Sequence, residues 1–167
     1  MGKDFTFTIG IITISDKASK GERIDKSGPA IEKILKTIGG NVKKYLIVPD
    51  EKKEIVSAIK EMSDIDNIDL ILTTGGTGFA KRDNTPEATL EVIEKTVPGL
   101  TEVMRIEGLK ITPMAMLSRA VAGIRENSLI INLPGSPKGV KENLEIIMPA
   151  LRHGIEILQG HASECAR

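Results

Sequence analysis

Four short apolar runs are distributed along the chain, and each is predicted to form a β-strand. The run from Phe5 to Ser15, FTFTIGIITIS, is rich in β-branched residues and almost continuously apolar from Ile9 onward. This pattern is typical of a strand that is covered on both faces. Similar runs occupy Val42 to Val48, Ile68 to Thr73 and Ser128 to Leu133.

Apolar residues at helical spacing fill the segments between these runs. The stretch from Pro29 to Ile38 has this spacing and ends at Gly39-Gly40, which favours a left-handed helix stop. A second helix is predicted over Lys53 to Met62. Further helices are predicted to begin at Pro86, with Thr85 as its N-cap, at Pro98, and after Pro137. Within the last of these, Pro149 predicts a break or kink between Ile147 and Leu151.

The alternation of strands and helices predicts an α/β fold of three layers, with a mostly parallel sheet and helices on both faces. No internal repeat or linker interrupts the pattern, so residues 1–160 are predicted to form one domain. The segment 161–167 lacks apolar periodicity and is predicted to be a flexible C-terminal tail.

Composition narrows the possible partners. The 167 residues include 23 Lys plus Arg and 23 Asp plus Glu, which argues against the broad basic surface that nucleic acid binding needs. Only Cys165 carries a thiol, so neither an internal disulfide nor a cysteine metal cluster can form. No apolar run reaches the roughly 18 residues of a membrane span, and we expect a cytoplasmic protein without a membrane partner.

The loops that follow the strands are the places to search for a site, because ligands of open α/β sheets bind beyond the carboxyl ends of the strands. Four such loops carry suggestive residues. They are Ser15-Asp16, Pro49-Asp50-Glu51, Thr73 to Asp83, and Pro134 to Gly139. We expect them to converge on one edge of the sheet.

The sharpest of these signals is the run TTGGTG at Thr73 to Gly78. Its glycines allow backbone N–H groups to point at one anion, and its threonines add hydroxyl donors. It is neither a dinucleotide fingerprint nor a P-loop, because no lysine follows the last glycine. A phosphate-binding turn is favoured over a tight strand exit without a ligand.

Asp50 and Asp83 are candidates to hold Mg²⁺ on a triphosphate, since a carboxylate beside phosphates needs a cation to offset its charge. Alternatively, Asp50 is an ordinary turn residue after proline, and Asp83 pairs with Lys81 or Arg82 or caps its loop. Spacing alone leaves both alternatives open.

Three further side chains are candidate ligand contacts. Ser136 lies in a rigid turn between two prolines, and Ser118-Arg119 offers a hydroxyl and a guanidinium suited to phosphate. A plain strand-to-helix turn and a surface ion pair are the alternatives. His153 and His161 have no partners at metal-ligand spacing, and no Ser-His-Asp or Cys-His set can be assembled.

The segment from Leu70 to Thr89, LILTTGGTGFAKRDNTPEAT, resembles the signature of the molybdopterin adenylyltransferases, including the corresponding plant domain and the N-terminal domain of gephyrin. The resemblance covers about residue 8 to about residue 158. Further matching motifs stand in the same order, namely IITISD at 11–16, DKSG at 25–28, IVPDE at 47–51, ITPMAMLSR at 111–119, AGIR at 122–125 and LIINLP at 129–134.

The resemblance implies a Rossmann-like fold, a homotrimer, and transfer of AMP from Mg²⁺-bound ATP to the terminal phosphate of molybdopterin with release of pyrophosphate. It implies a molybdenum insertase as a possible later partner. The family's two essential aspartates fall on Asp50 and Asp83, which we assign to Mg²⁺ or phosphate orientation, and Arg119 or Lys138 would help to neutralise phosphate charge. The binding loops would contribute Ser15, Asp16, Thr74, Gly75, Gly76, Thr77, Gly78, Ser118, Arg119, Pro134, Gly135 and Ser136.

One departure from the family pattern is Asn84, where relatives usually have Val, but both aspartates are intact, which favours activity. The alternatives are a non-catalytic molybdopterin-binding or scaffold protein, and a different phosphate-dependent enzyme such as a nucleotide-sugar or competence-damage-type hydrolase. Which loop holds which phosphate, and whether the pathway uses molybdenum or tungsten, stay open.

Overall fold

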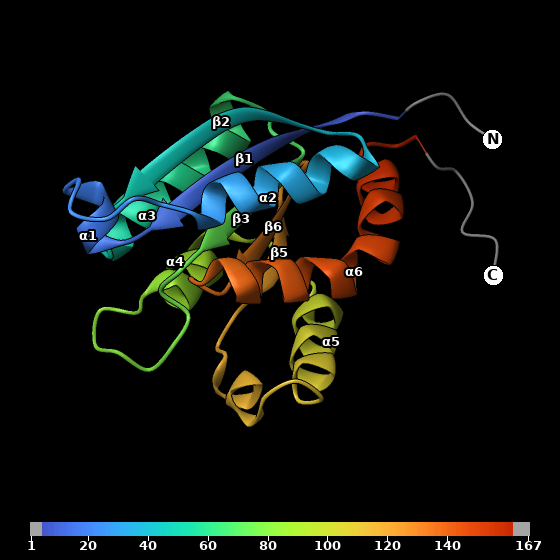
Figure 1. Cartoon of the computed structure of the whole chain (residues 1–167). Coiled ribbons are helices and arrows are strands. Elements are labelled where there is room, and N and C mark those ends of the chain that lie inside the picture. The colour runs from blue at the N-terminus through green and yellow to red at the C-terminus, as the bar shows by residue number, and fades with distance from the viewer. Residues whose placement is uncertain (1–4, 162–167) are drawn as a thin grey trace.

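A computed structural model of the chain describes residues 5–161 (Figure 1). Its centre is a six-stranded sheet in the order β2-β1-β3-β6-β5-β4. The pairs β1–β2, β1–β3 and β3–β6 are parallel, and β5 and β4 extend the sheet in antiparallel pairing. The strands are β1 (Phe7–Ile14), β2 (Gly40–Val48), β3 (Leu70–Thr74), β4 (Lys95–Thr96), β5 (Ala122–Arg125) and β6 (Ser128–Leu133).

Helices connect the strands and cover the sheet. The α-helices are α1 (Asp16–Ser19), α2 (Ser27–Leu35), α3 (Lys52–Lys60), α4 (Thr85–Val92), α5 (Pro98–Gly108) and α6 (Pro137–Leu158). Two short 3-10 helices are η1 (Lys36–Ile38) and η3 (Pro113–Leu117), and η2 (Glu61–Ile65) is a π-helix. Figure 1 shows α2 and α6 on one side of the sheet, and α5 with η3 projecting beyond it.

The alternation of side chains along β1 divides the core between the two faces of the sheet. Ile9 and Ile11 pack into a cluster that includes residues of α2, α5 and α6. Ile12 and Ile14 pack on the other face into a cluster with residues of α3 and α4. Because both faces are covered, the strands contain long apolar runs. The predicted three-layer α/β fold with a mostly parallel sheet is confirmed.

The four predicted strands and the predicted helices are present, with ends shifted by a few residues at most. The predicted stop after the first long helix is confirmed, because Gly39 has a φ of +91°. Two strands were not predicted: β4 and β5 are very short and pair only with each other or with β6.

One local prediction needs correction, and a second is settled in favour of one of its alternatives. Thr85 is not an N-cap: the cap is Asn84, and Thr85 is the first residue of α4, where its hydroxyl donates to Gly75 O at 2.8 Å. Of the predicted break or kink at Pro149, the structure shows a kink, because α6 continues through Pro149 without a break. Figure 1 shows α6 changing direction between its orange and red parts, as a proline inside a helix leads one to expect.

The predicted flexible tail at 161–167 lies outside the described residues except for His161, and the domain limits stay a prediction. Within 5–161, no helix combines the length and apolar character needed to span a membrane.

Candidate functional site

The loops that follow β1, β2, β3 and β6 meet at one edge of the sheet, as predicted. The first two are joined because Ser15 N donates to Val48 O at 2.9 Å. The last two are joined because Gly75 N donates to Leu133 O at 3.2 Å. The site is therefore assembled from segments that are far apart in the sequence.

The glycine turn after β3 requires glycine at two consecutive positions. Gly75 and Gly76 have φ values of +102° and +66°. A Cβ atom on Gly75 would lie 2.4 Å from Ile14 O, and one on Gly76 would lie 2.4 Å from Thr85 Oγ1. Within the described part of the chain, the amides of Gly76, Thr77 and Gly78 donate to no acceptor. The turn thus offers three consecutive N–H groups to a ligand, which suits an anion.

Two of the threonine hydroxyls are used inside the protein. Thr73 Oγ1 accepts a hydrogen bond from Asn132 Nδ2 at 2.9 Å, and Thr74 Oγ1 donates to Pro134 O at 2.7 Å. Both side chains are buried. The expectation that Thr74 donates to a ligand is therefore corrected, because its hydroxyl joins the glycine turn to the loop after β6. Thr73 Oγ1 only accepts, so its expected role as a hydroxyl donor stays a prediction.

Asp50 lies against the turn and is tied to Asp16. Its Oδ2 accepts from Asp16 N at 2.8 Å, and its own amide donates to Asp16 Oδ1 at 3.1 Å. Its Oδ1 lies 3.5 Å from the position that a Cβ on Gly76 would occupy. Burial, reinforced by the negative charges of Asp16 and Asp83, raises the pKa of the Asp50 carboxyl. Holding this group ionised is costly without a cation.

Asp83 approaches the same turn from its other end. Its Oδ2 accepts from Ala80 N at 2.9 Å and lies 2.8 Å from the position of a Cβ on Gly78. Across residues 5–161, neither Asp50 Oδ1 nor Asp83 Oδ1 accepts a hydrogen bond. Two carboxylates, each with one available oxygen, therefore flank the glycine turn.

The carboxylates of Asp50 and Asp83 fit Mg²⁺ only if a substrate supplies further ligands. Carboxylate oxygens are suitable ligands, and protein-bound Mg²⁺ commonly takes one or two of them together with phosphate oxygens and water. The described residues contain no group of three or more His, Cys, Asp or Glu side chains that could hold a metal alone. Substrate phosphates are the natural remaining ligands.

Arg82 does not pair with Asp83, which was one alternative, but bridges the loops after β1 and β2. It donates to Asp16 Oδ2 and Oδ1 at 2.6 and 2.9 Å and to Glu51 Oε1 at 2.7 Å. The Arg82 guanidinium lowers the pKa of the Asp16 carboxyl. Ser15 caps α1 by accepting from Ala18 N at 3.2 Å. Ser15 and Asp16, both predicted to contact a ligand, thus have hydrogen-bond partners inside the protein.

Arg119 holds the loop that carries Asp83. Its Nε donates to Gly78 O at 2.8 Å, its Nη2 donates to Asp83 O at 2.7 Å, and its Nη1 pairs with Glu87. Three of its five N–H groups thus have protein acceptors and fix the loop, while the expected guanidinium contact with phosphate stays a prediction. The sequence pointed to Arg119 but not to its acceptors.

Ser118 and Ser136 lie on the walls of one cavity. Ser118 Oγ accepts from Ala120 N at 3.3 Å. Ser136 is exposed and caps α6 by accepting from Gly139 N at 3.1 Å, which leaves its O–H able to donate. The preceding Pro134 also lines this cavity, while Gly135 is exposed beside it.

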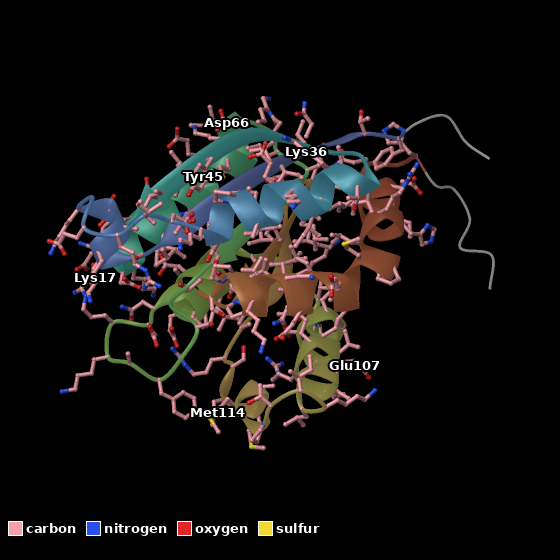
Figure 2. All side chains as sticks on the ribbon, viewed as in Figure 1. Lys17, Lys36, Tyr45, Asp66, Glu107 and Met114 are labelled. Carbon is pink, nitrogen blue, oxygen red and sulfur yellow. The ribbon has the colours of Figure 1, made fainter. Side chains whose placement is uncertain are left out.

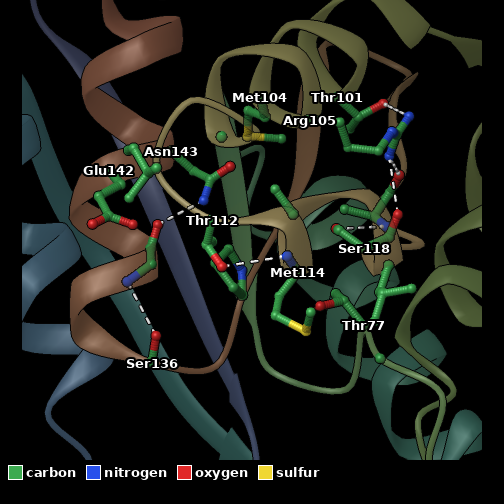
Figure 3. Close-up of a pocket in the computed structure, with 18 of the residues that line it drawn as sticks. Thr77, Thr101, Met104, Arg105, Thr112, Met114, Ser118, Ser136, Glu142 and Asn143 are labelled. Atoms are coloured by element: carbon green, nitrogen blue, oxygen red, sulfur yellow. Dashed lines mark hydrogen bonds between the residues drawn. The ribbon is translucent and has the colours of Figure 1, made fainter.

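The cavity has a volume of about 620 Å³ and lies between α5, η3, the start of α6 and Gly78 (Figure 3). That is within the range of small-molecule sites. Its apolar lining includes Met104, Ile111, Met114, Leu117 and Ile146. Thr77, Thr112 and Asn143 add polar groups. Sequence reasoning missed Met104 and Asn143, and the only signal for this wall was the apolar ITPMAML segment.

Comparisons with known proteins show similarity over most of the chain. Residues 10–153 match the family model described as a probable molybdopterin binding domain. The chain is 47% identical over 158 residues to the molybdopterin adenylyltransferase of Helicobacter pylori strain J99, covering 93% of this chain and 90% of the relative. It is 42% identical to gephyrin of Dictyostelium discoideum, covering 93% of this chain and 23% of gephyrin.

Among solved structures, the molybdopterin biosynthesis enzyme MoaB from Thermus thermophilus superposes with a TM-score of 0.89 at 50% identity. The alignment covers 93% of this chain and 98% of that structure. Both the sequence and the strand arrangement therefore extend the likeness over nearly the whole described chain.

Proposed function

The chain belongs to the family of probable molybdopterin binding domains, and we propose that it is a molybdopterin adenylyltransferase. It transfers AMP from Mg²⁺-bound ATP to the terminal phosphate of molybdopterin and releases pyrophosphate. The observation that carries the proposal is the placement of Asp50 and Asp83 at the two ends of a glycine turn with three available amides.

The two kinds of surface at this edge suit the two substrates. The triphosphate of ATP belongs beside Asp50 and Asp83, because these two carboxylates can hold a cation that offsets the negative charge of several phosphates. The molybdopterin ring belongs in the cavity, whose apolar walls suit a flat heterocycle. The glycine turn is common to both surfaces, because Gly78 lines the cavity and also lies beside Asp83, so we place the reacting phosphates at this turn.

The reaction needs no strong protein base. The nucleophile is a phosphate oxygen of molybdopterin, already ionised near neutral pH, and it attacks the α-phosphorus of ATP. The protein contributes by aligning the two phosphates and by directing N–H donors at their charge. Bound Mg²⁺ would be held by Asp50 and Asp83 and would offset negative charge on the phosphates.

The direct test incubates the protein with molybdopterin and Mg²⁺-bound ATP and measures pyrophosphate and the mass of the pterin product. We expect adenylylated molybdopterin, and a loss of about 10²-fold or more in kcat for Asp50→Asn and Asp83→Asn with pterin binding kept. Asp66→Asn is the matched control, because Asp66 pairs with Lys44 away from this edge. Pterin binding without pyrophosphate would indicate a scaffold protein, and turnover without ATP would indicate a hydrolase.

We propose further that the active form is a homotrimer in the cytoplasm, and that its product passes to a metal insertase. The support for the trimer is the family likeness together with exposed apolar side chains on the α5–η3 projection. Figure 2 shows Met114 at the end of this projection, and other exposed members are Ile106, Leu109 and Met116. Multi-angle light scattering of the purified protein measures the number of chains.

A further inference from the structure

The DKSG motif at 25–28 lies outside the proposed chemistry, yet its aspartate collects several hydrogen bonds. Asp25 accepts from Thr13 Oγ1 at 2.8 Å, from Ser27 N at 2.9 Å and from Gly28 N at 3.0 Å. Tyr45 on β2 also donates its hydroxyl to Asp25. Burial raises the pKa of the Asp25 carboxyl, but these donors together outweigh it and hold that pKa below its usual value. Asp25 therefore fixes the start of α2 against β1 and β2.

Ser27 connects the start of α2 to the candidate site. It is the first residue of α2 and is only 3% exposed. Its Oγ donates to Gly135 O at 2.9 Å, across 108 positions of sequence. Because Asp25 accepts from the backbone N–H of Ser27, it fixes the position from which the Ser27 hydroxyl reaches Gly135 O.

The glycine turn holds the same loop from its other side. Leu133 O accepts from Gly75 N, and Pro134 O accepts from Thr74 Oγ1. Gly135 O accepts from Ser27, so three consecutive carbonyls each have a donor from a segment remote in the sequence. Gly135 also packs closely on Gly75, since a Cβ on Gly135 would lie 3.3 Å from Gly75 Cα. The loop that presents Ser136 is thus clamped between α2 and the glycine turn.

We propose that Ser27, oriented by Asp25, is a positioning residue that sets the affinity for molybdopterin by anchoring the Pro134–Ser136 loop. The inference rests on the proposed function for the identity of the ligand. Ser136 and Pro134 line the cavity, whereas Ser27 does not, so Ser27 acts only through the loop. Losing one anchor lets the loop sample positions in which Ser136 no longer meets the ligand.

The test compares Ser27→Ala with Ser128→Ala. Ser128 is a matched control because its buried Oγ donates to Ile68 O at 2.6 Å, at the end of β6 opposite to the site. Both variants should lose stability. Only Ser27→Ala should raise the KM for molybdopterin, by about tenfold, with the KM for ATP unchanged. Amide exchange measured by mass spectrometry should accelerate in the peptide covering residues 133–140.

A second variant, Thr74→Val, removes the anchor on the other side of the loop. It should also raise the KM for molybdopterin. Combining it with Ser27→Ala should raise that KM by more than the two single effects together, because the loop then lacks both side-chain anchors. Asp25→Asn should reproduce the Ser27→Ala pattern, since it loosens the base of the same anchor.

The proposal is overturned if Ser27→Ala matches Ser128→Ala in both the exchange of residues 133–140 and the KM for molybdopterin. An equal rise in both KM values also overturns it. The exchange measurement needs no turnover, so it judges the anchor even if the wild-type protein releases no pyrophosphate, a result that would overturn only the proposed function.

Discussion

Asp50 shows how a single residue can oppose folding while serving a site. Its carboxyl is partly buried beside Asp16 and Asp83, and this environment raises its pKa. A carboxylate whose pKa is raised by folding makes the folded state less stable wherever that group is ionised. Without a bound cation, Asp50 therefore lowers the free energy of unfolding at neutral pH.

We expect Asp50→Asn to unfold at a higher temperature than the wild type at pH 7 in the absence of Mg²⁺. This increase in unfolding temperature should disappear as the pH is lowered below the ordinary aspartate pKa. Below the ordinary aspartate pKa of 3.8 both states of the wild type are protonated, and the destabilisation appears only as pH rises through the window from 3.8 to the raised value. Calorimetry between pH 3 and pH 7 measures this. A gain that is independent of pH would contradict an electrostatic origin.

Arg119 illustrates a side chain whose geometry matters more than its charge. Lysine cannot reproduce three nitrogens bonded to Gly78, Asp83 and Glu87. Arg119→Lys should therefore lower stability by about 1–3 kcal/mol and raise the KM for ATP, because the loop carrying Asp83 loosens. Urea unfolding and steady-state kinetics measure these effects. Arg152→Lys is the control, since Arg152 bonds Glu156 within α6, and it should leave the KM for ATP unchanged.

At the residue scale, the sequence identified most of the polar groups near the site but not their partners. Asp50, Asp83 and Ser136 all lie at the predicted edge. The acceptors of Arg119 could not be predicted, because Asp83 lies 36 positions away and no local pattern relates the two residues. The bond from Thr74 to Pro134 O spans 60 positions and depends on the pairing of β3 with β6.

At the scale of elements, the glycine turn is set by backbone conformation. Gly75→Ala would place a side chain at a φ of +102° and 2.4 Å from Ile14 O. The strained dihedral alone costs about 1–3 kcal/mol, and the displaced backbone adds to it. We expect a clear loss of stability in urea and a loss of adenylylation. Gly99→Ala is the control, because Gly99 lies in α5 with nothing within 4 Å of a Cβ, and it should be neutral or slightly stabilising.

The elements that the sequence predicted correctly are those with long local patterns. The strands β1 and β6 have nearly continuous apolar runs, and α2 has helical spacing with a glycine stop. The strand β4 contains two residues, both exposed, so it has no hydrophobic signal of its own. The antiparallel pairing of β4 and β5 is a tertiary feature, which local periodicity cannot indicate.

On the scale of the whole molecule, the strand order explains why the site could be located from the sequence. Parallel pairing of β2, β1, β3 and β6 directs the exits of all four strands to one edge. The cavity beside the α5–η3 projection was not predictable in the same way, because its lining joins Met104, Met114 and Ile146 from α5, η3 and α6. The cavity is therefore a product of tertiary packing rather than of any one motif.

Mg²⁺ and ATP should stabilise the whole fold strongly only when both are bound, because each supplies what the site of the other lacks. Mg²⁺ alone finds two carboxylates and no third acidic ligand within residues 5–161, and ATP alone meets uncompensated negative charge at Asp50 and Asp83. Mg²⁺ with ATP at 100 times its Kd should stabilise the fold by about 2.7 kcal/mol, or roughly 5–10 °C in Tm. Either component alone, with EDTA present for ATP, should give a much smaller shift in differential scanning fluorimetry. The Asp50→Asn/Asp83→Asn double variant should lose the cooperation between Mg²⁺ and ATP, whereas an undiminished shift from ATP in EDTA would place the triphosphate away from the two aspartates.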